Sequence, residues 1–223
     1  MPRLAPPEDC PGLFVDELVP AGTVLWRVHA DRYAAEAFNP TPRRPGASPF
    51  VEGGRFDSID GSYAYLYGAR SLGGAFAETF ARNLDYTRPG PRPLRFNLVA
   101  GKVSSSIEVQ RDLHLVQVYG AGAEQLGQDG WLTACTEDDY PLTRQWAAAV
   151  RRWAPSSDGL AWKSRRDPSQ DVMMLWGAPA GAAIGCGVVK KDGEAPLVLG
   201  SGPGLLVLQQ WLVKWRLYIE PGP

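Results

Sequence analysis

The order of side chains predicts a strand near the beginning of the chain. Residues 23–29 are rich in β-branched and aromatic side chains, a composition typical of strands. Because successive side chains of a strand point to opposite faces, Trp26 and Val28 share an apolar face, whereas Arg27 and His29 lie on the other. The pattern therefore places a cationic side chain of this strand opposite a strongly apolar surface.

A helix is predicted soon after a short strand over residues 63–67. Ser71 suits a helix cap, and apolar side chains follow at helical spacing, so the helix is expected to run to about Asn83. Gly73 and Gly74 weaken its first turn by about 1 kcal/mol each relative to alanine, which either close approach of a backbone or ligand, or fraying, would explain. Further strands are expected over 94–99, 160–164, 172–176 and 215–219, helices from Tyr140 and over 203–212, and a mixed segment over 107–119.

The chain is expected to form one domain of the α+β class. Residues 1–12 are rich in proline and acidic side chains and suit an extended arm, whereas residues 13–223 are long enough to bury one substantial core. A connection over 38–54 is rich in proline and glycine, and long connections inside compact domains are often functional. The glycine-rich stretches at 181–187 and 200–204 lack the neighbours of a phosphate-binding loop and are interpreted as turns.

Composition argues against several classes of protein. Lys and Arg total 23 against 24 for Asp and Glu, a balance that disfavours nucleic-acid binding by bulk electrostatics. The three cysteines lie far apart, and His29 and His114 lack acidic residues at metal-ligand spacing, so neither a disulfide framework nor a metal site is expected. No stretch of about 18 apolar residues occurs, so the protein is expected to be soluble and cytoplasmic, without a membrane contact.

Three side chains in one short stretch indicate a site that cleaves a dinucleotide. Arg55 follows two glycines and offers a permanently charged fork for phosphate oxygens. Tyr67 offers a flat amphipathic face for a ring. Glu78 offers a carboxylate that can stabilise positive charge developing on a sugar. Together they supply the contacts that breaking a glycosidic bond in a dinucleotide requires.

Each of these residues also has a purely structural explanation. Arg55 could be a solvated turn residue, and Glu78 could be the polar edge of its helix. Tyr67 could belong to the core, in which case Tyr63 or Tyr65 would be the tyrosine of the pocket. The ordered combination of these side chains, rather than any one of them, carries the functional interpretation.

The order of several short motifs resembles that of the RES-domain family, bacterial toxins named after their Arg, Glu and Ser residues. Each motif alone is unspecific, but their shared order makes chance a poor explanation. The resemblance implies an α+β fold, with the split β-sheet core and flanking helices of ADP-ribosyltransferases. It covers most of the chain and rests on Leu25-Trp26-Arg27, Gly53-Gly54-Arg55-Phe56, Leu66-Tyr67-Gly68-Ala69, Ala75 to Glu78, Tyr140 to Ala147 and Asp158 to Arg165.

The resemblance implies an enzyme that takes NAD+ as its substrate and uses no prosthetic group. Glu78, Arg55 and Tyr67 fall on its catalytic positions, and Arg27 and Ser164 are implied as further contacts to the dinucleotide. Arg27 and Arg55 would grip the pyrophosphate, with Tyr67 at the nicotinamide side. Ser164 would bond the ribose or the amide edge. Cleavage of the nicotinamide–ribose bond by water or inorganic phosphate would deplete cellular NAD+.

Two other functions remain open for the same residues. Transfer of ADP-ribose to a protein side chain would use them equally, because the acceptor depends on what fits beside the sugar. A non-catalytic module that binds a partner through its Trp- and Arg-bearing surface is the other, although a pure scaffold has no need of two arginines and a carboxylate. Family members are usually restrained by an antitoxin, which is expected here to cover the cleft near Arg55 and Glu78.

Overall fold

Nine strands form one mixed sheet in the described part of the chain. The computed structural model describes residues 3–42, 53–82, 84, 90–179 and 187–221. The strands follow the order β1-β6-β7-β8-β3-β2-β5-β10, and β9 also pairs with β5. The strands are β1 (Asp16–Val19), β2 (Val24–Ala30), β3 (Ala64–Ala69), β5 (Lys102–Val109), β6 (Leu113–Gln117), β7 (Gly159–Lys163), β8 (Asp171–Gly177), β9 (Val189–Lys191) and β10 (Leu197–Val198).

The sheet is split between β2 and β3. β2 pairs with β5 over seven residues and β3 pairs with β8 over six, but the one β2–β3 pair among the described residues is Trp26 with Ala69. The segment that follows β2 lies where the two strands separate. Arg27 of β2 donates to the Ala35 and Ala37 carbonyls of this segment, and Asn39 at its end forms a bridge to Tyr65 of β3. The expected α+β fold with a split sheet is therefore confirmed.

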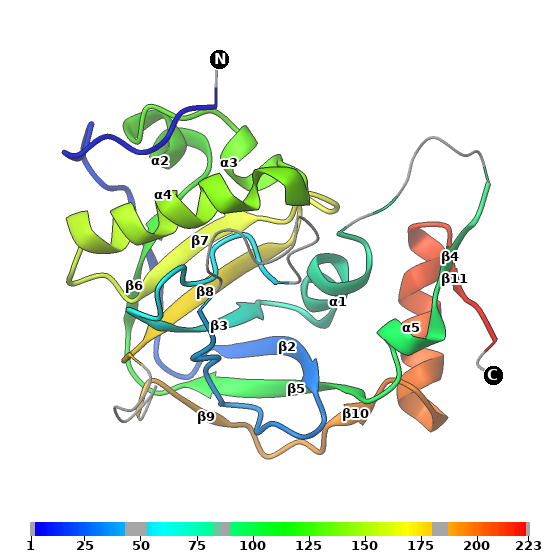
Figure 1. Cartoon of the computed structure of the whole chain (residues 1–223). Coiled ribbons are helices and arrows are strands. Elements are labelled where there is room, and N and C mark those ends of the chain that lie inside the picture. The colour runs from blue at the N-terminus through cyan, green and yellow to red at the C-terminus, as the bar shows by residue number, and fades with distance from the viewer. Residues whose placement is uncertain (1–2, 43–52, 83, 85–89, 180–186, 222–223) are drawn as a thin grey trace.

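The helices flank the sheet on different sides (Figure 1). α4 (Tyr140–Trp153) crosses β7 and β8, with the shorter α2 (Gly120–Gln125) and α3 (Trp131–Ala134) near it. α1 (Leu72–Phe80) follows β3 directly and packs against β2. α5 (Gly202–Lys214) lies at the far side, beside a parallel pair of short strands, β4 (Arg92–Leu94) and β11 (Leu217–Ile219).

Buried apolar side chains fill both faces of the sheet. Under α4, Trp146 and Val150 pack with Trp162 and Trp176 from β7 and β8. The opposite face buries a second cluster that contains Leu25, Ile107 and Leu175. Burying a large apolar side chain stabilises a fold by about 1.5–3 kcal/mol, so these clusters fix the strands that carry the site.

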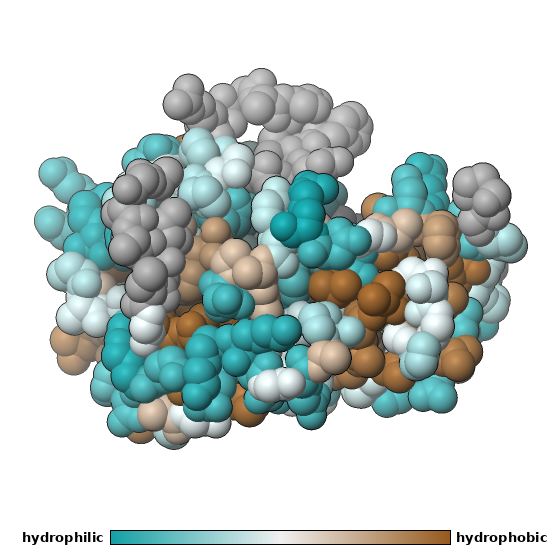
Figure 2. Space-filling view, turned by 90° about the horizontal axis from the view of Figure 1, so that it is seen from below, coloured by the Kyte–Doolittle hydropathy of each residue, from teal (hydrophilic) through white to brown (hydrophobic). Residues whose placement is uncertain are grey.

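A third cluster joins α1 to α5. Phe76 of α1 packs with Leu208 and Leu212 of α5, whereas Leu206 and Val213 remain exposed on the outer face of that helix. Figure 2 shows apolar side chains gathered on the side of the molecule where α5 lies. α1, which carries Glu78, is therefore held between the sheet and α5.

Gly73 allows this close approach of α1 and α5. A Cβ at Gly73 would lie 2.3 Å from the Trp211 ring of α5. The close contact between the two helices therefore explains the glycine in the first turn of α1. We expect Gly73→Ala to lower the free energy of unfolding by about 1–3 kcal/mol in urea denaturation, because overpacking displaces neighbours. Trp211→Leu should remove most of this penalty, and Gly193→Ala, at a position with nothing within 4 Å, should be neutral. Equal effects of Gly73→Ala with and without Trp211 would contradict this explanation.

Most predicted elements are present, with differences at their ends. The strands over 23–29, 63–67, 160–164 and 172–176 correspond to β2, β3, β7 and β8, and the predicted helices to α1, α4 and α5. Ser71 caps α1 by accepting a bond of 3.0 Å from the Gly74 N–H, as expected. The helix ends at Phe80 rather than near Asn83, which lies outside the described residues.

The predicted strand over 94–99 is wrong after Leu94. The chain turns into a 3-10 helix, Phe96–Leu98, and Gly101 at a φ of 67° then reverses it into β5. β5 begins at Lys102, earlier than the mixed segment expected from residue 107, and β1, α2 and α3 were not predicted. The expected turn over 181–187, and residues 43–52 of the long connection, lie largely or wholly outside the described residues.

Residues 3–12 contain no helix or strand and lie against α4. Trp146 donates from Nε1 to the Leu4 carbonyl at 2.9 Å, and Trp153 does so to the Glu8 carbonyl at 2.9 Å. The division into an arm over 1–12 and a domain over 13–223 stays a prediction. Among the described residues, no helix has the length and apolarity needed to cross a membrane.

Candidate active site

A cavity of about 360 Å³ opens where the sheet splits. Its walls come mainly from β2, β3, α1, the first residue of α4 and the turn that carries Arg55, with single residues of β5 and β7 and two of β8. This volume lies within the range of ligand-binding pockets, about 300–1,000 Å³. The polar, charged and indole side chains among its lining residues are Trp26, Arg27, Asn39, Arg55, Asp57, Tyr65, Tyr67, Glu78, Thr79, Arg82, Lys102, Tyr140 and Trp162.

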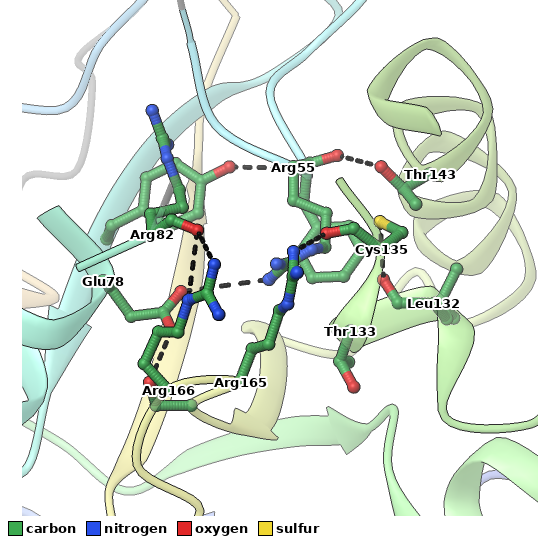
Figure 3. A network of polar contacts seen from close by, with 12 residues as sticks. Arg55, Glu78, Arg82, Leu132, Thr133, Cys135, Thr143, Arg165 and Arg166 are labelled. Atoms are coloured by element: carbon green, nitrogen blue, oxygen red, sulfur yellow. Dashed lines mark hydrogen bonds and ion pairs between the residues drawn. The ribbon is translucent and has the colours of Figure 1, made fainter. Parts of the chain in front are cut away.

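Arg55 and Glu78 form an ion pair inside this cavity. Arg55 Nη1 lies 3.8 Å from Glu78 Oε2, and Figure 3 shows the two side chains pointing toward one another from the turn and from α1. The Arg55 side chain is 3% exposed and the Glu78 side chain 21%, so the arginine forms the base of the site and the carboxylate stays open to a ligand. Because the arginine is buried away from water, its attraction to the carboxylate is stronger than it would be at the surface. Loss of either partner would leave a buried charge unpaired and would destabilise the fold.

Ser164 fixes the second oxygen of the same carboxylate. It is buried at the end of β7, and its hydroxyl donates to Glu78 Oε1 at 2.7 Å. Its own backbone N–H donates to the Gln170 carbonyl at 3.0 Å, so the loop after β7 is anchored. Glu78 is therefore oriented from both sides, by an arginine at one oxygen and a hydroxyl at the other.

Two of the three candidate tyrosines line the cavity. Tyr67 and Tyr65 are lining residues, whereas Tyr63 is buried in the core against Trp176. The Tyr67 hydroxyl is already engaged: it donates to Asp57 Oδ1 at 2.8 Å and accepts from the Phe56 N–H at 2.9 Å. Burial and the Asp57 carboxylate raise the pKa of Tyr67 well above its usual value, so the phenol stays protonated.

Arg27 reaches across the split in the sheet. Its Nη1 donates to the carbonyls of Ala35 and Ala37, each at 2.8 Å, and its Nε is buried without a hydrogen-bond partner among the described residues. Burial lowers the pKa of Arg27 to about 10, although Glu36 opposes this shift. Arg27 thus lines the same cavity as Arg55 but is not joined to the Arg55–Glu78 pair.

Tyr140 is a residue of the site that sequence reasoning did not single out. Three guanidinium groups lie over its buried ring, those of Arg55 at 5.6 Å, Arg82 at 5.8 Å and Arg144 at 5.8 Å from the centroid. Such cation–π contacts stabilise positive charge near the cavity. A signal was available, because Tyr140 opens the motif that runs to Ala147 in the resemblance to the RES-domain family.

Arg82 and Lys102 are the other cationic residues that were missed. Both line the cavity. Arg82 Nη2 lies 3.6 Å from Glu137 Oε1, and the Arg82 side chain is 28% exposed. No ion pair of Lys102 occurs within the described residues. Both lie outside the short motifs, so their sequence context gave no signal.

The two arginines after Ser164 tie the site together. Arg166 donates from Nε to the Ala81 carbonyl at 2.8 Å and from Nη2 to the Arg82 carbonyl at 3.0 Å, which satisfies carbonyls at the end of α1. Arg165 donates to the Cys135 carbonyl at 2.9 Å. Figure 3 shows Arg166 beside Glu78 and the Arg82 carbonyl, and Arg165 directed toward Cys135. The loop after β7 therefore holds α1 and the segment after α3 in place around the carboxylate.

Comparison with known proteins places the chain in a family. A family model described as "RES domain" matches residues 24–197. The chain belongs to the RES-domain family. All five predicted site residues, Arg27, Arg55, Tyr67, Glu78 and Ser164, lie within the matched part. A search of curated proteins finds no match.

The RES domain of this chain also has a counterpart of similar fold among solved structures. It is similar to a chain in the crystal structure of the M. tuberculosis MbcT-MbcA toxin-antitoxin complex, with a TM-score of 0.57 and 13% sequence identity. The match covers 88% of this chain and 92% of that one, so the likeness extends over nearly the whole fold. At this identity the comparison concerns the fold alone.

Proposed function

We propose that this RES domain binds NAD+ and cleaves the bond between nicotinamide and ribose. The observation that carries the proposal is the Glu78 carboxylate, held between Arg55 and Ser164 and still open to a cavity in the split of the sheet. Departure of neutral nicotinamide from a cationic nucleotide needs little help from an acid. The sugar that remains has oxocarbenium character and needs a nearby anion. Glu78 supplies that charge.

The charges and donors around the cavity support a dinucleotide as ligand. Arg55, Arg82 and Lys102 place positive charge along its walls, which suits a pyrophosphate. Buried N–H donors without a partner in the described part of the chain occur at Arg55 Nε, Arg82 Nε and Trp162 Nε1, all on lining residues. These nitrogens have almost no accessible surface, so the support for a ligand rich in acceptor oxygens comes from the cationic side chains on the walls.

The predicted binding residues receive the following roles. Arg55 grips the pyrophosphate, and Arg27 assists from β2, where its Nη1 is held by the carbonyls of Ala35 and Ala37. Tyr67 contributes its ring to the nicotinamide side, since its hydroxyl is bonded to Asp57 and Phe56. Ser164 orients Glu78 toward the ribose. Orientation of this kind can contribute several kcal/mol to catalysis.

In the cell, such an enzyme would deplete NAD+ and act as the toxin of a toxin–antitoxin pair. The solved relative was crystallised as a toxin–antitoxin complex, which supports an analogous protein partner for this chain. We propose that this antitoxin covers the cavity near Arg55 and Glu78, because an uncontrolled NAD+-cleaving enzyme would harm its own cell. A complex that leaves the cavity open would contradict that placement.

The test of this function is direct. Purified protein is incubated with NAD+, with and without inorganic phosphate, and the products are separated by chromatography. We expect release of nicotinamide, with ADP-ribose as co-product if water is the acceptor and ADP-ribose phosphate if phosphate is. Nicotinamide release only when a cell extract is added, with labelled ADP-ribose on protein, would instead identify a transferase. No release under any of these conditions would contradict the proposal.

A further inference from the structure

The backbone of the turn that carries Arg55 is held by side chains, four of them from other parts of the chain. Residues 54–57 belong to neither helix nor strand. Side chains bind the backbone groups of Gly54, Arg55 and Phe56 in five hydrogen bonds. These are Gly54 N–H to Asp57 Oδ2 at 2.8 Å, Arg144 Nε to Gly54 O at 3.1 Å, Thr143 Oγ1 to Arg55 O at 2.6 Å, Phe56 N–H to Tyr67 Oη at 2.9 Å, and Tyr63 Oη to Phe56 O at 3.1 Å.

The turn is also tightly packed, with no room for a side chain at Gly54. A Cβ at Gly54 would lie 2.4 Å from the Tyr67 hydroxyl and 2.5 Å from Asp57 Oδ1. Thr143 and Arg144 are both buried, with exposures of 0% and 2%. Their bonds to the turn are therefore made away from water, where losing a partner leaves a buried carbonyl unsatisfied and costs more than the bond itself contributes.

Two of these side chains come from the first turns of α4, which is itself firmly packed. Trp146 and Val150 of α4 lie in the main core, each 1% exposed. Tyr140, at the start of the same helix, lies under the guanidinium of Arg55. One rigid helix thus contacts both the backbone and the side chain of the arginine (Figure 3 shows Thr143 beside Arg55).

We propose that Thr143 is a positioning residue that sets Arg55 toward Glu78 and the substrate pyrophosphate. Its hydroxyl donates to the Arg55 carbonyl and fixes the backbone from which the guanidinium extends. Arg144 supports the preceding peptide in the same way. The part of this inference that concerns pyrophosphate rests on the proposed function, whereas the part that concerns the position of Arg55 does not.

The first experiment measures ligand binding. Affinity for ADP-ribose is determined by calorimetry for wild type, Thr143→Val and Thr143→Ser. We expect Thr143→Val to bind about tenfold more weakly, since one well-placed hydrogen bond is lost, and Thr143→Ser to bind nearly as wild type. Thr23→Val is the matched control, because the Thr23 hydroxyl donates to the Pro20 carbonyl at 2.6 Å in a turn outside the cavity, and it should bind normally.

A double-mutant cycle then separates positioning from general destabilisation. If Thr143 acts through Arg55, Thr143→Val should have little further effect on affinity in an Arg55→Lys background. If Thr143 is only structural, its effects on affinity should be additive to those of Arg55→Lys, and that result would overturn the proposal. Unfolding midpoints of all variants show which of them are destabilised.

A second measurement does not depend on the ligand. The Arg55 Nε–H resonance is assigned in the NMR spectrum by its absence in Arg55→Lys, and its shift is compared in Thr143→Val and Thr23→Val. We expect it to move in the first variant and to stay in place in the second. A resonance unmoved by Thr143→Val would overturn the inference. Failure of the wild type to bind ADP-ribose, with a resonance that does move, would count against the proposed function alone.

Discussion

Glu78→Gln is expected to lower the rate of nicotinamide release by about a thousandfold or more while NAD+ still binds. The substitution keeps the size of the side chain and an oxygen for the Ser164 hydroxyl, but it removes the negative charge. That charge acts mainly when positive charge develops on the ribose, so its loss should lower kcat much more than it raises KM. The measurement is steady-state kinetics of NAD+ cleavage by chromatography, with NAD+ affinity determined separately.

Glu124→Gln serves as the matched control for this substitution. Glu124 is exposed on α2 and lies outside the cavity, so its variant should cleave NAD+ as wild type does. Because Arg55 would be left facing a neutral amide, the unfolding midpoint of Glu78→Gln must also be compared with that of wild type. A folded Glu78→Gln enzyme with normal kcat would exclude Glu78 as the charge that stabilises the sugar.

The polar pair at the centre of the site could be anticipated from sequence, since its spacing was informative. Glu78 stood among apolar residues of a predicted helix, a setting that already marked it as a candidate, and Ser71 defined where that helix starts. The faces of β2 were also predicted correctly: Leu25 is buried in the cluster opposite the one that Trp26 contacts. These features depend on local periodicity, which a single sequence records.

The arrangement that sequence could not provide depends on contacts between distant segments. The Thr143 hydroxyl meets the Arg55 carbonyl across 88 positions of chain, and Ser164 meets Glu78 across 86. Arg144 shares its helix with two other arginines, yet it is 2% exposed and its Nε donates to the Gly54 carbonyl, a contact that its position along the helix does not indicate. Local patterns fix which face of a helix is apolar, but not which polar residue another segment will bury.

The hydroxyl of Tyr67 illustrates the same limit. The position of Tyr67 in a short strand left open whether it belongs to the core or to the pocket. In the structure it packs against the core and also lines the cavity. Its ring lines the cavity, while its oxygen holds the turn through Asp57 and Phe56. A residue with two polar contacts outside its own strand cannot be assigned from the alternation of that strand.

The buried charges of the site explain why the cavity is organised around Arg55. A guanidinium that is 3% exposed has lost most of its hydration and depends on the ring of Tyr140 and the carboxylate of Glu78. Glu78, at 21%, keeps access to a ligand. Under the proposed function, a pyrophosphate would bind the guanidinium at the base of the cavity, and the positive charge that develops on the ribose during cleavage would lie near the more open Glu78 carboxylate.

Replacement of Arg55 by lysine should therefore be nearly as harmful as its removal. Lysine keeps the charge but loses the planar fork that can hold a carboxylate and a pyrophosphate together. Its side chain is also shorter, and its ammonium group is more strongly hydrated. We expect kcat/KM for NAD+ cleavage to fall about a hundredfold or more, with weaker ADP-ribose binding. Both kinetics and calorimetry are needed, because Arg55 acts on the substrate and on Glu78 at once.

Arg95→Lys is the matched control, since Arg95 is exposed and lies outside the cavity. That variant should retain wild-type kinetics and stability. Comparison of Arg55→Lys with Glu78→Gln separates the two roles: the first should weaken ADP-ribose binding, whereas the second should leave it nearly intact, because Glu78 acts on the charged sugar rather than on the pyrophosphate. An Arg55→Lys enzyme that binds ADP-ribose and cleaves NAD+ like the wild type would show that charge alone suffices at this position and that the forked geometry is not required.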